Sequence, residues 1–314
     1  MSRRITCIRY ARAQSAHTRI GARLRVLTTL IVLVTMLALS ATTSIASATR
    51  SPRSYPSRIV SLSPTATEML FAIGAGHQVV AVDEASDYPK DAPHTSLSGL
   101  DPNVEAIAKY RPQLVVISYN PSNFEQTIEK LGVKVLLQDA PSNLAGAYAQ
   151  IDQLGQVTGH VSAANALVAR MKRQIRAAVR AAPHFSKAPR YFYELDQGGY
   201  SVTSTTFVGK LLAMFGLRDI ADAAKGASDG YPDLSTEYIV KSNPNLIFLA
   251  DTICCHQSLS TVAKRPGYRA MAAVRDRDVF GLNDDIASRW GPRVVVLAQD
   301  IEKDLWLYER RQAS

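Results

Sequence analysis

The side chains with the most distinctive chemistry are Cys254, Cys255 and His256, which directly follow the apolar run Leu246 to Ala250. Adjacent cysteines can close a strained ring disulfide, and two thiolates with an imidazole can bind a soft metal such as zinc or copper. Direct contact with a bound ligand is a third interpretation. Metal capture is the weakest of the three because no fourth ligand is apparent nearby, and an oxidising compartment would favour the disulfide.

Four tyrosines at predicted loops or strand ends form a second group of candidates: Tyr88, Tyr119, Tyr200 and Tyr231. Ligands of parallel sheets bind outside the carboxyl ends of the strands. A tyrosine ring there can stack on a flat or bulky ligand at little entropic cost. Any one of the four could instead pack over the edge of the core, but as a set they favour a ligand site.

The sequence lacks the motifs of common catalytic sites. It contains no G-x-S-x-G, no G-x-x-x-x-G-K-[ST] and no H-E-x-x-H. The histidines beyond the first 48 residues are scattered without metal-ligand spacing, and the pair Asp284-Asp285 has no placed partner for acid–base chemistry. We therefore predict a protein that is not an enzyme and that has neither a metal site nor a cofactor of its own.

The positive charge of the chain is concentrated in its first 48 residues. These contain seven arginines and no acidic residue, so that the net charge of +9 falls to +2 in the remainder. A nearly neutral remainder without a basic stripe between aromatic residues argues against nucleic acid as a partner.

The same 48 residues have the pattern of an export signal. An Arg-rich start precedes the apolar run Val26 to Leu39, which is short for a bilayer span, and the small residues Ala46-Ser47-Ala48 follow. We predict a signal peptide over 1–48 that is cleaved near Ala48; an uncleaved anchor is the alternative. Residues 49–57 are polar and are expected to form a flexible mature N-terminus. No cysteine directly follows the apolar run, so the sequence shows no site for lipid attachment. We expect an exported protein that is periplasmic or at the cell surface, and we expect it to be a monomer.

Strand and helix patterns alternate along the rest of the chain, which predicts an α/β fold with parallel sheets. Between two such regions, residues 161–182 consist mostly of good helix formers and predict a helix about 33 Å long. Because 314 residues exceed what one core holds, we predict an N-terminal lobe over 58–160, a linker helix over 161–182 and a C-terminal lobe over 183–314. The expected strands are 59–62, 79–82, 114–117, 133–137, 191–193, 246–249 and 279–280.

A weak internal repeat supports two equivalent lobes. In each half a glutamate on a short predicted helix is followed seven residues later by a proline, then by any residue, a leucine and an apolar strand. The first half has Glu105 and Pro112, and the second has Glu237 and Pro244.

The segment RIVSLSPTATE, residues 58–68, resembles the start of the periplasmic cobalamin-binding and iron-complex-binding proteins of ABC transporters. SDYP at 86–89 and SRWGPR at 288–293 resemble the cobalamin branch of that family, and the resemblance covers residues 58–308. It implies a class III periplasmic-binding-protein fold, in which a single long rigid helix joins two Rossmann-like lobes that close only slightly on the ligand.

By this resemblance, five residues are expected to contact a ligand in the cleft between the lobes: Tyr88, Tyr200, Tyr231, Asp285 and Arg289. Gly99 and Ile286 stand where the cobalamin branch can have aromatic residues, and the Cys-Cys-His segment is outside the family pattern. Haem and a ferric siderophore therefore remain open beside a corrinoid, and a tyrosine could ligate haem iron.

Each lobe in this family presents a glutamate that docks against arginines of the permease dimer in the cytoplasmic membrane, and the matching positions are Glu105 and Glu237. Ion pairs of this kind guide encounter and register more than affinity. The sequence thus predicts the extracytoplasmic solute-binding component of an ABC importer, which captures a small metal-complex ligand, a cobalamin-type corrinoid, and delivers it to the permease. The alternative from another class is an extracytoplasmic thiol- or metal-handling protein built on Cys254, Cys255 and His256.

Overall fold

The structure is a computed structural model that describes residues 54–313, apart from the side chain of Ser122. The predicted signal peptide over 1–48, its cleavage near Ala48 and residues 49–53 of the predicted flexible terminus lie outside the described residues. Residues 54–57 contain no helix or strand. No helix within 54–313 is long and apolar enough to cross a membrane.

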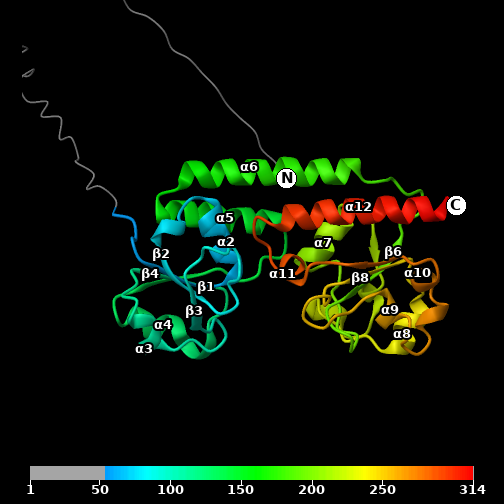
Figure 1. The fold of residues 1–314 in the computed structure, drawn as a ribbon, viewed down its shortest axis with the longest axis horizontal. Helices are drawn as coiled ribbons and strands as arrows, with labels where there is room; N and C mark the ends of the chain where they lie inside the picture. Colours follow the sequence, from blue (N-terminus) through cyan, green and yellow to red (C-terminus); the bar gives the residue numbers. More distant parts are fainter. Residues whose placement is uncertain (1–53, 314) are drawn as a thin grey trace, which may run out of the picture. The chain divides into compact units, whose positions relative to one another are not determined.

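The first lobe is built on a five-stranded parallel sheet with the order β3-β2-β1-β4-β5 (Figure 1). Its apolar central strands are buried on both faces, as parallel sheets require. The strands are β1 (Ile59–Leu62), β2 (Val79–Asp83), β3 (His94–Leu97), β4 (Leu114–Ile117) and β5 (Lys134–Leu137). The helices are α2 (Pro64–Ala72), α3 (Val104–Ala108), α4 (Phe124–Glu129) and α5 (Leu144–Thr158), with 3-10 turns at Gly76–Gln78 and Pro121–Asn123.

The second lobe is built on a four-stranded parallel sheet with the order β7-β6-β8-β9. The strands are β6 (Arg190–Glu194), β7 (Arg218–Asp219), β8 (Leu246–Leu249) and β9 (Val279–Gly281). The helices are α7 (Phe207–Ala213), α8 (Thr236–Ser242), α9 (Leu259–Val262), α10 (Ala272–Arg275), α11 (Asp284–Ala287) and α12 (Val294–Gln312), with 3-10 turns at Ala221–Ala223, Ala227–Asp229 and Tyr268–Ala270.

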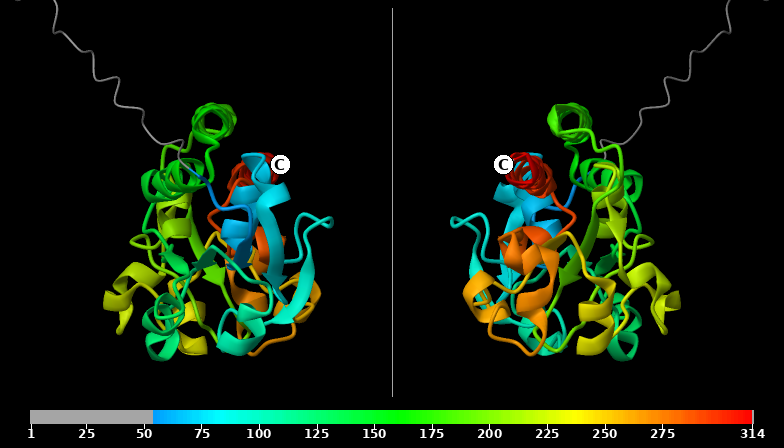
Figure 2. Two further views of the ribbon diagram at one scale, coloured as in Figure 1. Left: turned by 90° about the vertical axis from the view of Figure 1, so that its left-hand side faces the viewer. Right: turned by 90° about the vertical axis from the view of Figure 1, so that its right-hand side faces the viewer.

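Helix α6 (Val161–Ala181) carries the chain from the first sheet to the second, where the sequence predicts a helix over 161–182. It packs on α5 of the first lobe and on α12 of the second, and Figure 2 shows it end-on above both. The indole of Trp306 in α12 also donates a hydrogen bond to the Ala181 carbonyl at 2.9 Å. The buried residues of α6 recur every three or four positions and form one apolar stripe: Ala164, Leu167, Val168, Met171, Ile175 and Ala178.

The two sheets repeat one topology. In each lobe the first strand lies between the next strand of the chain and a later one, as β1 lies between β2 and β4 and as β6 lies between β7 and β8. The helix that precedes this later strand is α3 in one lobe and α8 in the other. These are the helices that carry Glu105 and Glu237, so the repeat read from the sequence corresponds to equivalent elements.

Candidate functional site

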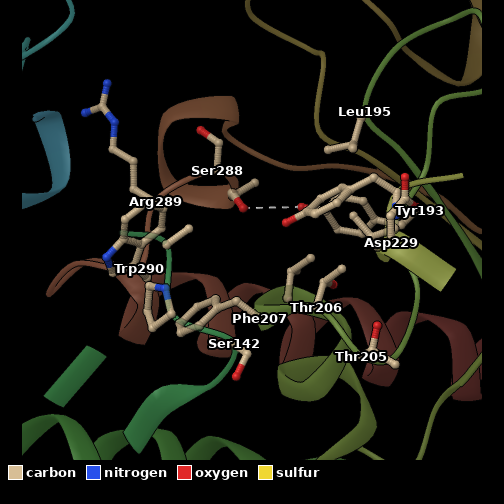
Figure 3. A pocket seen from close by; sticks show the side chains of 16 residues that line it. Ser142, Tyr193, Leu195, Thr205, Thr206, Phe207, Asp229, Ser288, Arg289 and Trp290 are labelled. Carbon is tan, nitrogen blue, oxygen red and sulfur yellow. Dashed lines mark hydrogen bonds between the residues drawn. The ribbon is translucent and has the colours of Figure 1, made fainter. Parts of the chain in front are cut away.

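A cavity of about 380 Å³ lies where the two lobes meet, a volume within the range of small-molecule sites. The first lobe contributes Ala140 to Ser142, which follow β5, and the second lobe contributes the rest, from β6, α7, α11 and the loops beside them. This is the region beyond the carboxyl ends of parallel strands, where such folds bind ligands. The walls include aromatic side chains, with Tyr193, Phe207 and Trp290 gathered around the space in Figure 3.

Two of the predicted tyrosines come together at this cavity. Tyr231 lines it, and its ring stacks on that of Tyr200 with a centroid distance of 6.2 Å and an interplanar angle of 27°. Both rings are 42% exposed, so they offer an aromatic surface to a ligand. Burial raises the pKa of Tyr231 above its usual value, and the neighbouring Tyr200 adds to this effect. Tyr88 and Tyr119 are exposed and are not among the residues that line the cavity.

Arg289 and Asp285, the two predicted polar contacts, belong to an ionic cluster that joins the lobes. The Arg289 guanidinium donates to the carboxylates of Glu68 at 3.1 Å, Asp87 at 2.7 Å and Asp285 at 3.0 Å. It also donates to the Ala85 carbonyl at 3.1 Å. The pKa of Asp87 is lowered, because the hydrogen bond and charge of Arg289 outweigh the effect of burial. Burial is the main reason why the pKa of Asp285 is raised.

Glu68 and Arg293 complete the cluster, although neither is among the site residues expected from the sequence. Arg293 donates to both oxygens of Glu68, at 2.9 Å from Nε and 2.6 Å from Nη2. Its guanidinium carbon lies 4.4 Å from the centre of the Tyr88 ring, within cation–π range. Tyr88 is therefore held at the lobe boundary. The sequence carries one signal for Glu68, since it is the only charged residue of α2.

Glu105 and Glu237 lie outside the cavity on equivalent helix starts. Each is exposed and occupies the second position of its helix, after an Asn103 or Ser235 cap whose side chain accepts a backbone N–H. Within residues 54–313 neither carboxylate takes part in a hydrogen bond or ion pair. Figure 1 shows α3 and α8, the helices that carry the two glutamates, on the side of the two lobes away from α6.

The Cys254-Cys255-His256 segment forms an exposed loop that does not line the cavity. Both cysteines are free, with Sγ atoms 2.6 Å apart. The Asp284 carboxylate anchors the loop by accepting the backbone N–H groups of Thr252 at 2.8 Å and Cys254 at 2.8 Å. The hydrogen bond with Cys255 raises the pKa of the Cys254 thiol to about 12. In the described part of the chain, no three His, Cys, Asp or Glu side chains gather in a way that could hold a metal.

Two parallel sheets of one topology are connected by a long helix, and a cavity with aromatic lining residues lies between them. This arrangement defines a two-lobed solute-binding protein. The chain belongs to the periplasmic binding protein family, whose sequence model matches residues 59–286. A cobalamin-binding protein of Halobacterium salinarum is 30% identical over 251 residues, which cover 77% of this chain and 67% of that one. An ABC transporter substrate-binding lipoprotein of Bacillus subtilis is 27% identical, with 80% of each chain covered.

A solved periplasmic heme-binding protein of Roseiflexus superposes with a TM-score of 0.70 at 25% identity, covering 80% of this chain and 98% of that chain. The two-sheet architecture is thus the class III periplasmic-binding-protein fold that the sequence predicts. Members of this family are the substrate-binding proteins of ABC transporters: they are exported, bind a small ligand and work with a membrane permease. The chain is accordingly a binding protein and not an enzyme.

Proposed function

We propose that the protein captures a cobalamin-type corrinoid between its lobes and delivers it to the permease dimer of an ABC importer. The observation that carries the proposal is which charged side chains line the cavity. Arg289 is the only cationic residue among the described residues that line it. Its guanidinium already contacts three carboxylates and extends away from the other labelled side chains in Figure 3.

This arrangement suits the periphery of a corrinoid better than that of haem. A corrinoid carries neutral amide side chains, which hydrogen-bond to hydroxyl groups, carbonyls and carboxylates. Haem carries two propionates, which bind best to cations that can donate charge-assisted hydrogen bonds. The Tyr200–Tyr231 stack offers a flat ring system an aromatic surface. The 30% identical relative that is named a cobalamin-binding protein supports the same ligand class.

Haem is the second candidate, with a ferric siderophore as a further one of the same kind. The similar heme-binding structure and the position of Tyr231 at the cavity favour it, because a tyrosinate can ligate haem iron. The raised pKa of Tyr231 opposes this role, since ligation requires the ionised phenol.

Delivery needs no covalent chemistry. The ligand binds between the lobes, Glu105 and Glu237 meet basic residues of the permease on the side that carries α3 and α8, and the ligand passes into the transporter. Charges at the rim of an interface set encounter rate and register, which fits two exposed glutamates on equivalent helices.

The test is a calorimetric titration of the purified protein with cyanocobalamin, alongside an absorbance titration with ferric haem. We expect saturable one-to-one binding of cyanocobalamin without turnover, and weaker binding of haem. Tight haem binding with no heat from cyanocobalamin would reverse the assignment of the ligand.

A further inference from the structure

Glu68 is a buried acid whose ionic partners all come from the other lobe. Its residue is 3% exposed in a helix that otherwise contains only uncharged residues. Its carboxylate binds Arg289 at 3.1 Å and Arg293 at 2.6 Å. Both arginines lie in the segment 288–293 that joins α11 to α12, so one side chain of α2 connects the first lobe to this segment.

The position of Arg293 depends on its contacts with Glu68. In residues 54–313 the only carboxylate hydrogen-bonded to Arg293 is that of Glu68, although the charges of Asp87 and Asp285 also act on it. Its guanidinium covers the Tyr88 ring at 4.4 Å. The hydrogen bond to Glu68 raises the pKa of Arg293. Arg289, by contrast, retains Asp87 and Asp285 if Glu68 is removed. Neutralising Glu68 would therefore release one cation beside Tyr88.

We propose that Glu68 is a positioning and specificity-determining residue, which fixes the two lobes at one separation and keeps Arg293 from binding a ligand carboxylate. A buried carboxylate that bridges two cations resists separation, because either group left alone in the interior is strongly unfavourable. The described residues that line the cavity then present no unpaired cation, and ligands that carry carboxylates lose the partner they need. The specificity part of this inference rests on the proposed corrinoid function, whereas the positioning part does not.

The test compares Glu68→Gln with a matched control, Asp278→Asn. Both substitutions neutralise a buried acid that is paired with an arginine, but the Asp278–Arg311 pair links the residue before β9 to α12 within the second lobe, whereas Glu68 pairs with arginines of the other lobe. Each variant is titrated with cyanocobalamin and with ferric haem. We expect Glu68→Gln to weaken cyanocobalamin binding about tenfold and to raise the ratio of haem to cyanocobalamin affinity about tenfold or more. Asp278→Asn should leave this ratio unchanged.

A second measurement does not depend on the ligand. Spin labels at Lys109→Cys, directly after α3, and at Lys241→Cys on α8, both exposed positions, report the distance between the lobes in a background in which every other cysteine is serine. We expect Glu68→Gln to broaden the distance distribution about twofold, and Asp278→Asn to leave it unchanged.

The outcomes separate the two proposals. If the unsubstituted protein fails to bind cyanocobalamin, the proposed function falls, and the label distances still decide the positioning role. If it binds cyanocobalamin but Glu68→Gln shifts neither the affinity ratio nor the distance distribution beyond Asp278→Asn, the inference about Glu68 is overturned. A loss of affinity for both ligands in equal measure would reduce Glu68 to a structural residue.

Discussion

The Tyr200–Tyr231 pair shows how one aromatic contact sets a testable affinity. Tyr231 lines the cavity and supports Tyr200, so Tyr231→Ala removes both a stacking surface and the support of its neighbour. We expect the affinity for cyanocobalamin to fall about tenfold or more, since an aromatic pair contributes roughly 1 kcal/mol beyond its buried area. Calorimetry measures the change. Tyr55→Ala is the control, because Tyr55 is equally exposed at 42% but packs beside Gly159; an equal loss there would contradict the assignment.

Asp251 is a residue whose effect on stability should depend on pH. Both of its carboxylate oxygens are buried without a hydrogen-bond partner. Burial and the nearby charge of Glu194 raise the pKa of Asp251 to about 7, above the unfolded value of about 3.9. The folded state therefore binds more protons between these pH values, and its free energy of unfolding falls as the pH rises from about 4 to about 7.

We expect Asp251→Asn, an uncharged isostere, to raise the free energy of unfolding by roughly 4 kcal/mol at pH 8 and to change it little at pH 4. Urea denaturation at the two pH values measures this difference. Asp276→Asn, at a partly exposed acid, is the control. A gain from Asp251→Asn of the same size at both pH values would argue for packing and against titration.

Among the elements, α3 and α8 carry the prediction about docking. Glu105→Lys and Glu237→Lys reverse a charge on an exposed first turn without changing the cavity. Each substitution is expected to reduce ligand uptake into cells roughly tenfold while the affinity of the isolated protein stays the same. Glu309→Lys on α12, on the side of α6 in Figure 1, should leave uptake intact. Unchanged uptake in the Glu105→Lys/Glu237→Lys double variant would exclude these residues as docking contacts.

The Cys254–Cys255 loop is the element that tests the thiol-handling hypothesis. A reactive cysteine needs a lowered pKa, whereas that of Cys254 is raised to about 12 by its hydrogen bond with Cys255. We expect the double variant Cys254→Ser/Cys255→Ser to bind cyanocobalamin with unchanged affinity, because the loop does not line the cavity. Thiol titration of the native protein with and without reductant measures whether a disulfide forms. A bound metal, or a loss of affinity in the variant, would revive the alternative.

The sequence predicted those elements whose pattern is strong over several residues. The apolar runs at 59–62, 114–117 and 246–249 are strands, and the helix expected over 161–182 is α6. The strands β3 and β7 were missed, because β3 is a polar edge strand with partly exposed residues and β7 has only two residues. Local pattern cannot identify such strands, since their pairing with a neighbour defines them.

The candidate site, too, could be predicted from the sequence only in part. Tyr200 and Tyr231 could be proposed as ligand contacts from loop position and family resemblance. The role of Glu68 could not, because its partners Arg289 and Arg293 lie 221 and 225 residues further along the chain. A single charged residue in an apolar helix indicates that a partner exists but does not identify it.

At the scale of the whole molecule, the shared core limits how far the lobes can move. One buried apolar cluster includes residues of both sheets, such as Val116 and Phe248, together with α6 residues such as Met171. A large hinge motion would have to repack this cluster, and close-packed interiors resist such repacking. The ionic cluster at Glu68 adds a second connection between the lobes.

We therefore expect saturation with cyanocobalamin to shift the mean distance between labels at Lys109→Cys and Lys241→Cys by less than about 2 Å, the range of preorganised complexes. Pulsed electron paramagnetic resonance on the free and saturated protein measures this shift. A shift well above 2 Å would show that the shared core yields on binding, and affinity would then depend on closure. A shift within this range would mean that the cleft exists in the free protein, and that the permease must distinguish loaded from empty protein by something other than a large closure.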